Sequence, residues 1–187
     1  PAEQRWEGHL PEMNPAIPAG SQTLQIDDDG TLWVGGTDKL SYQYPQRRFR
    51  SYELPGKTVH SFAPGSQGEI WLGSNNGLWR LDAETGQAEG PWLVPSPLPD
   101  NRITALTLDG QGTLYVATPR GVSLISHSGE TALATDEPVS WLGTDAAGHV
   151  WAAGRDGIGV LSPDGLGPTI YPMPDIVTAA LGSSGDV

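Results

Sequence analysis

Three arginines of this acidic chain, Arg102, Arg120 and Arg155, stand among Pro, Gly, Asn and Asp residues, outside its apolar runs. A guanidinium group carries several N–H donors in one plane and therefore suits a carboxylate, a phosphate or a sugar acid. The chain has only 10 Lys and Arg against 22 Asp and Glu, so basic residues gathered in one place would form a local anion site. This predicts a site for a small anionic or carbohydrate ligand.

Catalytic chemistry has less support in the sequence. The chain contains no H-E-x-x-H, no G-x-S-x-G and no G-x-x-x-x-G-K-[ST] motif. The histidines are far apart, at His9, His60, His127 and His149. We therefore expect no catalytic residues and no cofactor. If the protein were an enzyme using a metal and a histidine, His60 and Asp156 would be the only candidates for its centre.

The acidic run Asp27 to Asp29 could attract a hard cation such as calcium, which prefers oxygen ligands. The equivalent turns elsewhere in the chain read "GSQG", "DGQG", "DAAG" and "GSSG" and do not keep the carboxylates. We expect a solvated turn at this run and no metal site. At Asp109 and Asp145 we expect the carboxylates to accept backbone N–H groups of their turns.

The segments that must position these residues are copies of one unit. Glycine anchors recur 38, 44, 36 and 37 residues apart, at Gly30, Gly68, Gly112, Gly148 and Gly185. Three positions after the anchor comes an aromatic residue in four copies, at Trp33, Trp71, Tyr115 and Trp151. A repeat of this length with glycine turns and alternating apolar residues predicts four short strands per unit. The aromatic column is expected to pack between neighbouring units.

A four-stranded sheet of about 40 residues cannot bury both of its faces alone, so successive sheets must stack around an axis. The fold class predicted is all-β, a β-propeller segment of four complete four-stranded blades with partial blades at both ends. The chain is taken as a single domain, 1–187, or as a fragment of a larger propeller. Its blades are expected at about 21–55, 58–98, 102–136 and 138–173, with partial blades at 1–20 and 175–187.

In this register, the turns between second and third strands open on the same side as the segments that lead into the inner strands. These turns are residues 36–39, 74–77, 118–121 and 154–157. Short loops that converge on a rigid scaffold are the usual place for recognition. The predicted ligand residues on this side, which we call the rim, are His60, Asn75, Asn76, Arg102, Arg120, Trp141, Arg155 and Asp156. Trp141 stands where other units have a small residue, and it either stacks on a ligand such as a sugar ring or fills the channel.

Two stretches, "PLPDNRITALTLDGQGTLYVAT" and "GSQGEIWLGSNNGLWRLDAETG", resemble the two-component regulator propeller repeat. The departures are Tyr115 in place of Trp, Ala117 and Ala153 in place of Gly, and Asp38-Lys39 in place of Asn-Gly. The resemblance implies a non-catalytic sensor propeller, periplasmic or extracellular, of a bacterial receptor with a histidine kinase or diguanylate cyclase as its output.

Two other functions stay open. The stretch "IGVLSPDGLGPTIYPMP" is similar to the repeat of virginiamycin B lyase-type propellers, which implies a lyase or lactonase that uses a metal and a histidine. A scaffold for protein assembly is the third possibility. It would bind its partners through blade sides or open edges and bind nothing small at the rim.

The net charge and the two ends of the chain indicate which partners to expect. A net charge of -12 opposes binding to nucleic acid or anionic lipid, and the sequence has no apolar window that could span a membrane and no signal peptide. The first residue is not Met, which favours a processed or excised segment. The repeat pattern leaves open strand edges at both ends. We expect further blades of the same protein, or a second copy, to complete them.

Overall fold

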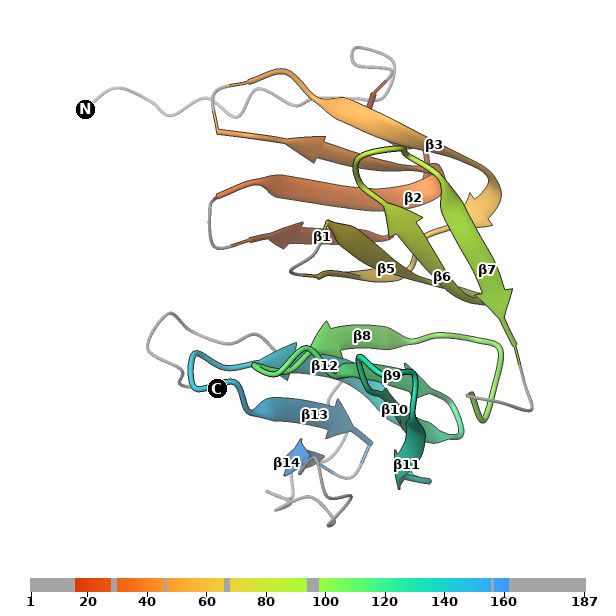
Figure 1. Cartoon of the computed structure of the whole chain (residues 1–187), viewed down its shortest axis with the longest axis vertical. Coiled ribbons are helices and arrows are strands. Elements are labelled where there is room, and N and C mark those ends of the chain that lie inside the picture. The colour runs from red at the N-terminus through yellow and green to blue at the C-terminus, as the bar shows by residue number, and fades with distance from the viewer. Residues whose placement is uncertain are drawn as a thin grey trace. The chain divides into compact units, whose positions relative to one another are not determined.

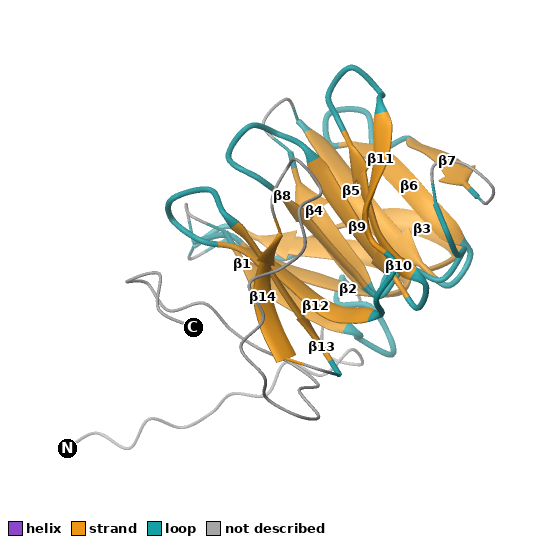
Figure 2. Ribbon diagram, turned by 90° about the horizontal axis from the view of Figure 1, so that it is seen from below, coloured by secondary structure: helices purple, strands orange, loops and turns teal. Residues whose placement is uncertain are grey.

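The computed structural model describes residues 16–27, 30–45, 47–65, 68–93, 98–155 and 157–161. All of the regular elements in these ranges are β-strands, and the described part of the chain contains no helix (Figure 2). It also offers no helical segment long and apolar enough to cross a membrane. The all-β prediction is confirmed.

The chain forms two compact units, Pro1–Val59 and His60–Val187. The first unit holds one antiparallel sheet with the order β1-β2-β3 (Figure 1), whose strands are β1 (Thr23–Ile26), β2 (Leu32–Gln43) and β3 (Arg50–Thr58). Extended chain rises about 3.3 Å per residue, so two residues nine positions apart on a straight strand would lie about 30 Å apart. The rings of Trp33 and Tyr42 are 5.2 Å apart. The β2 segment therefore folds back on itself, which agrees with the turn expected at 36–39.

The second unit holds three antiparallel sheets in which each strand pairs with its neighbour in sequence. The second blade consists of β4 (Ser61–Pro64), β5 (Glu69–Ser74), β6 (Gly77–Asp82) and β7 (Ala88–Trp92). The third consists of β8 (Ala105–Leu108), β9 (Leu114–Thr118), β10 (Gly121–Ile125) and β11 (Thr131–Thr135). The described part of the fourth consists of β12 (Val139–Thr144), β13 (Val150–Gly154) and β14 (Gly157–Leu161).

Neighbouring blades of the second unit pack face to face, with the inner strands β4, β8 and β12 in contact one after another. One apolar cluster lies between the second and third blades and includes Leu78, Ile103 and Val116, with Trp71 packed against it. A second cluster lies between the third and fourth blades and includes Tyr115, Leu124 and Leu142. The propeller-blade architecture predicted for the chain is thus confirmed, and Trp71 packs between blades as expected.

The repeated anchor glycines take the left-handed backbone conformation that favours glycine. Their φ angles are 81°, 81°, 82° and 86° at Gly30, Gly68, Gly112 and Gly148. A side chain with a Cβ is disfavoured there, which explains why the sequence repeats glycine at this position. The fifth anchor, Gly185, lies outside the described residues, as do the fourth strand of the last blade and nearly all of the predicted partial blades.

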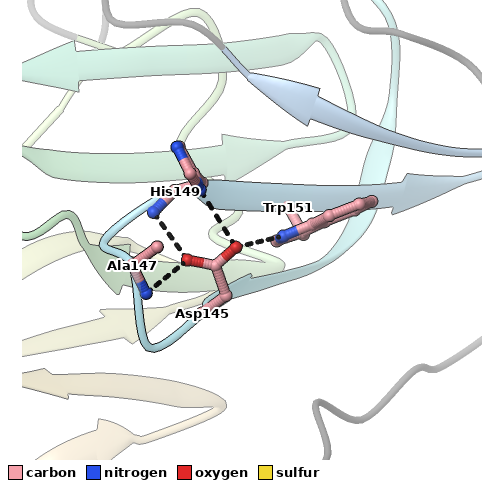
Figure 3. A network of polar contacts seen from close by, with 4 residues as sticks. All are labelled: Asp145, Ala147, His149 and Trp151. Carbon is pink, nitrogen blue, oxygen red and sulfur yellow. Dashed lines mark hydrogen bonds and ion pairs between the residues drawn. The ribbon is translucent and has the colours of Figure 1, made fainter. Parts of the chain in front are cut away.

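The carboxylate three residues before the anchor closes the turn. Asp145 Oδ1 accepts hydrogen bonds from the backbone N–H groups of Ala147 and His149, both at 2.9 Å (Figure 3). Its Oδ2 accepts one from the indole Nε1 of Trp151 at 3.0 Å and lies 3.2 Å from His149 Nδ1. In the first blade, Asp27 accepts the equivalent hydrogen bonds. Its Oδ1 accepts from Thr31 N and its Oδ2 from the Trp33 indole, both at 2.8 Å.

In the third blade the expected backbone bonds to Asp109 are present, from Gln111 N and Thr113 N at 2.8 Å. Tyr115 occupies the aromatic position, and its hydroxyl is buried without a hydrogen-bond partner among the described residues. Burial, and next the charge of Asp109, raise the pKa of Tyr115 to about 12. Tyr115 therefore acts as a core residue that stays neutral.

The Asp145 turn gives a pH-dependent contribution to stability. The hydrogen bond from the Trp151 indole, followed by those from His149 and Ala147, lowers the pKa of Asp145 to about 2. The pKa of an aspartate in an unfolded chain is about 3.9. Because the folded pKa is the lower one, the stabilisation is complete above about pH 4 and declines as the pH falls toward 2. We expect Asp145→Ala to destabilise the protein at pH 7, and the difference from the wild type to narrow below pH 4, in urea unfolding curves.

Asp136→Ala is the matched control, because Asp136 is an exposed aspartate of the same unit. It should change stability little at any pH. A deficit of Asp145→Ala that stays constant from pH 7 to pH 3 would contradict the role given to its carboxylate.

Candidate functional site

Two turns of the rim are built in the same way from a hydroxyl residue and a glycine. The Ser74 hydroxyl donates to Gly77 O at 2.9 Å and accepts from Asn76 N at 3.0 Å. In the next blade, the Thr118 hydroxyl donates to Gly121 O at 3.0 Å and accepts from Arg120 N at 3.1 Å. The buried hydroxyl satisfies the turn from inside, so the two residues at its tip point to solvent. Asn75, Asn76 and Arg120 are exposed there.

Backbone hydrogen bonds join the rim turn of the second blade to the segment that leads into the third. Gly77 N donates to Asn101 O at 2.7 Å, and Ile103 N donates to Ser74 O at 2.9 Å. Arg102, exposed between these two bonds, is held by its own N–H, which donates to Asp100 Oδ1 at 2.9 Å. The asparagine turn and Arg102 are therefore neighbours on one side of the unit, as the repeat register predicted.

His60 lies at the start of the second blade's inner strand, where its N–H donates to Gly73 O at 2.9 Å. Burial, and next the positive charge of Arg102, lower the pKa of His60 below its ordinary value. Its Nε2 and the neighbouring Ser61 hydroxyl are buried without hydrogen-bond partners among the described residues. The structure thus brings together His60 and Arg102, a neutral imidazole and a cation.

The remaining predicted ligand residues are placed on other elements. Trp141 is half-buried in β12, opposite Ala153 in the pairing register. Arg155 is exposed in the turn between β13 and β14, and Asp156 lies outside the described residues. Neither Arg102 nor Arg120 forms an ion pair within the described ranges. Their guanidinium groups can therefore turn toward a ligand without first breaking a salt bridge.

A metal centre has no support in the described ranges. They contain no group of three or more His, Asp or Glu side chains that could hold an ion. Asp27 uses both of its oxygens within its own turn. His60 and Asp156 are the pair considered for metal-assisted chemistry, and Asp156 lies outside the described residues.

The structure also contains a groove that the sequence did not suggest. It has a volume of about 840 Å³ and lies between the second and third blades. Its walls include Gly68, Gly112 and Thr85, which belong to turns at the strand ends opposite the rim. None of the predicted ligand residues lines it.

The floor of this groove is aromatic and its side is charged. The rings of Trp71 and Trp92 lie 5.5 Å apart and are inclined by 49°. Beside them, Arg80 Nη2 forms an ion pair with Glu89 Oε2 at 2.6 Å, and both side chains are largely exposed. The sequence contains one sign of this groove. Arg80 occupies the repeat position at which the third and fourth blades have the apolar residues Leu124 and Val160.

The repeat geometry agrees with sequence relationships. Residues 53–76 and 97–120 match the family described as two-component regulator propeller. Each matched stretch runs from the end of one blade, through an inner strand, to the rim turn of the next blade, and together they contain His60, Asn75, Asn76, Arg102 and Arg120. No curated protein is similar enough in sequence to count as a match.

Solved structures with the same blade arrangement are distant in sequence. Catalytically inactive virginiamycin B lyase from Staphylococcus aureus, solved with quinupristin, is 20% identical with a TM-score of 0.66, over 87% of this chain and 59% of the lyase. The extracellular domain of BT3049 from B. thetaiotaomicron, named as a hybrid two component system, is 17% identical with a TM-score of 0.66, over 81% of this chain and 23% of that one.

A third, the extracellular domain of BT4673 from B. thetaiotaomicron, named as a one component system, is 19% identical with a TM-score of 0.58, over 75% and 21% of the two chains. The chain thus spans a little over half of the lyase and less than a quarter of the two extracellular domains. At such identities the similarity shows the fold alone.

The environment of His60 can be tested directly. In an NMR titration of the imidazole we expect a midpoint below about 6.5, the ordinary value. Arg102→Ala should raise the midpoint, since it removes the repelling charge, but not restore the ordinary value, because burial is the larger cause. Arg120→Ala serves as the control and should leave the midpoint unchanged. An unshifted midpoint in the wild type would refute the burial of this ring.

Proposed function

We propose that this propeller is the ligand-binding sensor part of a bacterial signal-transduction receptor, located outside the cytoplasm and without catalytic activity. The observation that carries the proposal is that the two stretches matching the regulator propeller repeat contain five of the predicted rim residues. For two of these, the positive charge of Arg102 contributes to the lowered pKa of His60. The extracellular location of the structurally similar BT3049 and BT4673 domains supports the location.

The rim is suited to a small ligand that carries a carboxylate, a phosphate or a sugar acid. Arg102, in the segment that leads into the third blade, and Arg120, in the rim turn of the same blade, can donate to such a group. Asn75 and Asn76 add neutral donors and acceptors at the exposed turn tip. His60 is uncharged near neutral pH because its pKa is lowered, so it takes part as a neutral hydrogen-bonding group.

Thermal shift and calorimetry with D-glucuronate, D-galacturonate and inorganic phosphate test the rim. We expect at least one of these anions to bind the wild type, and Arg102→Ala and Arg120→Ala each to weaken it by about 10-fold or more, since hydrogen bonds to charged groups contribute about 1.5–3 kcal/mol. Arg48→Ala, at an exposed arginine of the first unit, is the matched control. If none of the three anions binds, or the variants bind as the wild type does, the rim site is wrong and an assembly scaffold is favoured.

An enzymatic function is the second candidate, because the lyase with 20% identity has the same fold over 87% of this chain. A lyase or lactonase of this kind would need a metal at His60. Calorimetric titration with Mg²⁺ and Mn²⁺ separates the candidates. Binding of either ion that His60→Ala abolishes supports the enzyme, whereas the sensor proposal expects no such binding.

We also propose that the first sheet docks against another propeller blade, from further blades of the same protein or from a second copy. Leu24 and Ile26 of β1 are 65% and 64% exposed. Two residues in the repeat column of Leu24, Leu106 and Leu142, are buried. The exposed pair therefore occupies a face that the third and fourth blades cover with a neighbouring sheet.

Sedimentation velocity of the 187-residue chain tests the second-copy form of this proposal. We expect concentration-dependent association that Leu24→Arg abolishes, since burying an unpaired charge opposes docking. Leu133→Arg, a change at an exposed leucine of β11, is the control and should leave association unchanged. A chain that remains monomeric at all concentrations would rule out the second copy.

A further inference from the structure

The groove between the second and third blades exists because the second blade departs from its own repeat. At the corresponding interface between the third and fourth blades, Tyr115 and Leu124 fill the space and are 0% and 6% exposed. In the second blade the same two positions hold Trp71 and Arg80, which face each other across β5 and β6. The Arg80 side chain is 46% exposed, so a polar wall replaces a packed apolar one.

A second departure from the repeat changes which groups surround the indole of Trp71. The indoles of Trp33 and Trp151 donate to the turn carboxylates of Asp27 and Asp145. The second blade has Gly65 at that turn position, so the turn aspartate that accepts from the indole in the first and fourth blades is missing there. Trp71 lies instead against Trp92.

A third departure supplies that second ring. Trp92 pairs with Leu78, while in the next blade Thr135 pairs with Val122, the residue in the column of Leu78. All three changes meet in the same groove, where Trp71, Arg80 and Trp92 are lining residues. Their combination gives two inclined indoles beside an ion pair.

We propose that this groove binds a neutral carbohydrate. A pyranose has apolar C–H faces that can lie on the indoles of Trp71 and Trp92, and its hydroxyl groups both donate and accept hydrogen bonds. The Arg80–Glu89 pair offers guanidinium N–H donors and carboxylate acceptors side by side, which matches adjacent hydroxyl groups. Gln87 and Thr131, also in the lining, extend the polar side.

The charges of the groove disfavour an anionic ligand. Four carboxylates, of Glu69, Asp82, Glu84 and Glu89, line it with one arginine, Arg80, so phosphates and sugar acids are repelled. Asp82 is already used by its turn, where Oδ1 accepts from Glu84 N at 2.9 Å and from Thr85 N at 2.7 Å.

This site is independent of the rim. It lies at the opposite strand ends, shares none of the predicted rim residues and calls for a neutral rather than an anionic ligand. Either proposal can therefore fail while the other stands.

Calorimetry of the full chain with maltohexaose, cellohexaose, xylohexaose and mannohexaose tests the inference. We expect at least one hexasaccharide to bind, with a change in tryptophan fluorescence on binding, and Arg80→Ala and Glu89→Gln each to raise Kd by about 10-fold. Both residues are exposed, so these variants should fold. Thr131→Val, which removes one lining hydroxyl on β11, is a further variant that keeps the shape of the side chain.

Arg48→Ala and Arg102→Ala are the controls and should bind the hexasaccharide as the wild type does, the second because Arg102 belongs to the rim. Hexagalacturonate should bind more weakly than the neutral sugar. The inference is overturned if none of the four hexasaccharides binds, if the groove variants keep the wild-type Kd, or if spermine binds with an affinity that Arg80→Ala increases, which would identify the groove as a cation site.

Discussion

Each sheet of this protein has two apolar faces and too few residues to cover either of them, and this constraint determines the rest of the structure. Leu106 and Leu142 are buried only because the face that carries each of them meets the preceding sheet. Gly73 shows how close that approach is, since a Cβ there would lie 2.5 Å from both Ile103 and the Ser61 hydroxyl. A blade is therefore stable as a neighbour of other blades, and its strand order follows the chain because each short turn can only join adjacent strands.

The same constraint explains how much the sequence reveals. Anchor glycines with φ near 80°, such as Gly112, are required by the backbone and recur in every unit, so blade number and register could be predicted. The backbone bonds to Asp109 and Asp145 follow from the same local geometry and were also predictable. The side of the molecule on which Arg102 and the asparagine turn meet followed from the register alone.

The groove was not predictable in this way because it depends on side chains that break the repeat. A single departure such as Arg80 has many explanations in a sequence without a structure, among them an ordinary solvated position. Only the pairing register shows that Arg80 faces Trp71 and Glu89 and that Trp92 joins them. In the first blade, by contrast, the register placed the turn of β2 correctly although Asp38, with φ 59°, stands there in place of a glycine such as Gly77.

The residues of the two candidate sites differ in how they affect the stability of the fold. At the rim, Ser74 and Thr118 hold the turn backbone, so the exposed tip residues can be of almost any type without affecting the core. In the groove, an arginine occupies a position where Leu124 is buried in the next blade, and full burial of a leucine contributes about 1.5–3 kcal/mol. Stability alone would favour an aliphatic residue at Arg80 and close packing around Trp71. The arginine and the two tryptophans at the same place therefore support a binding role for the groove.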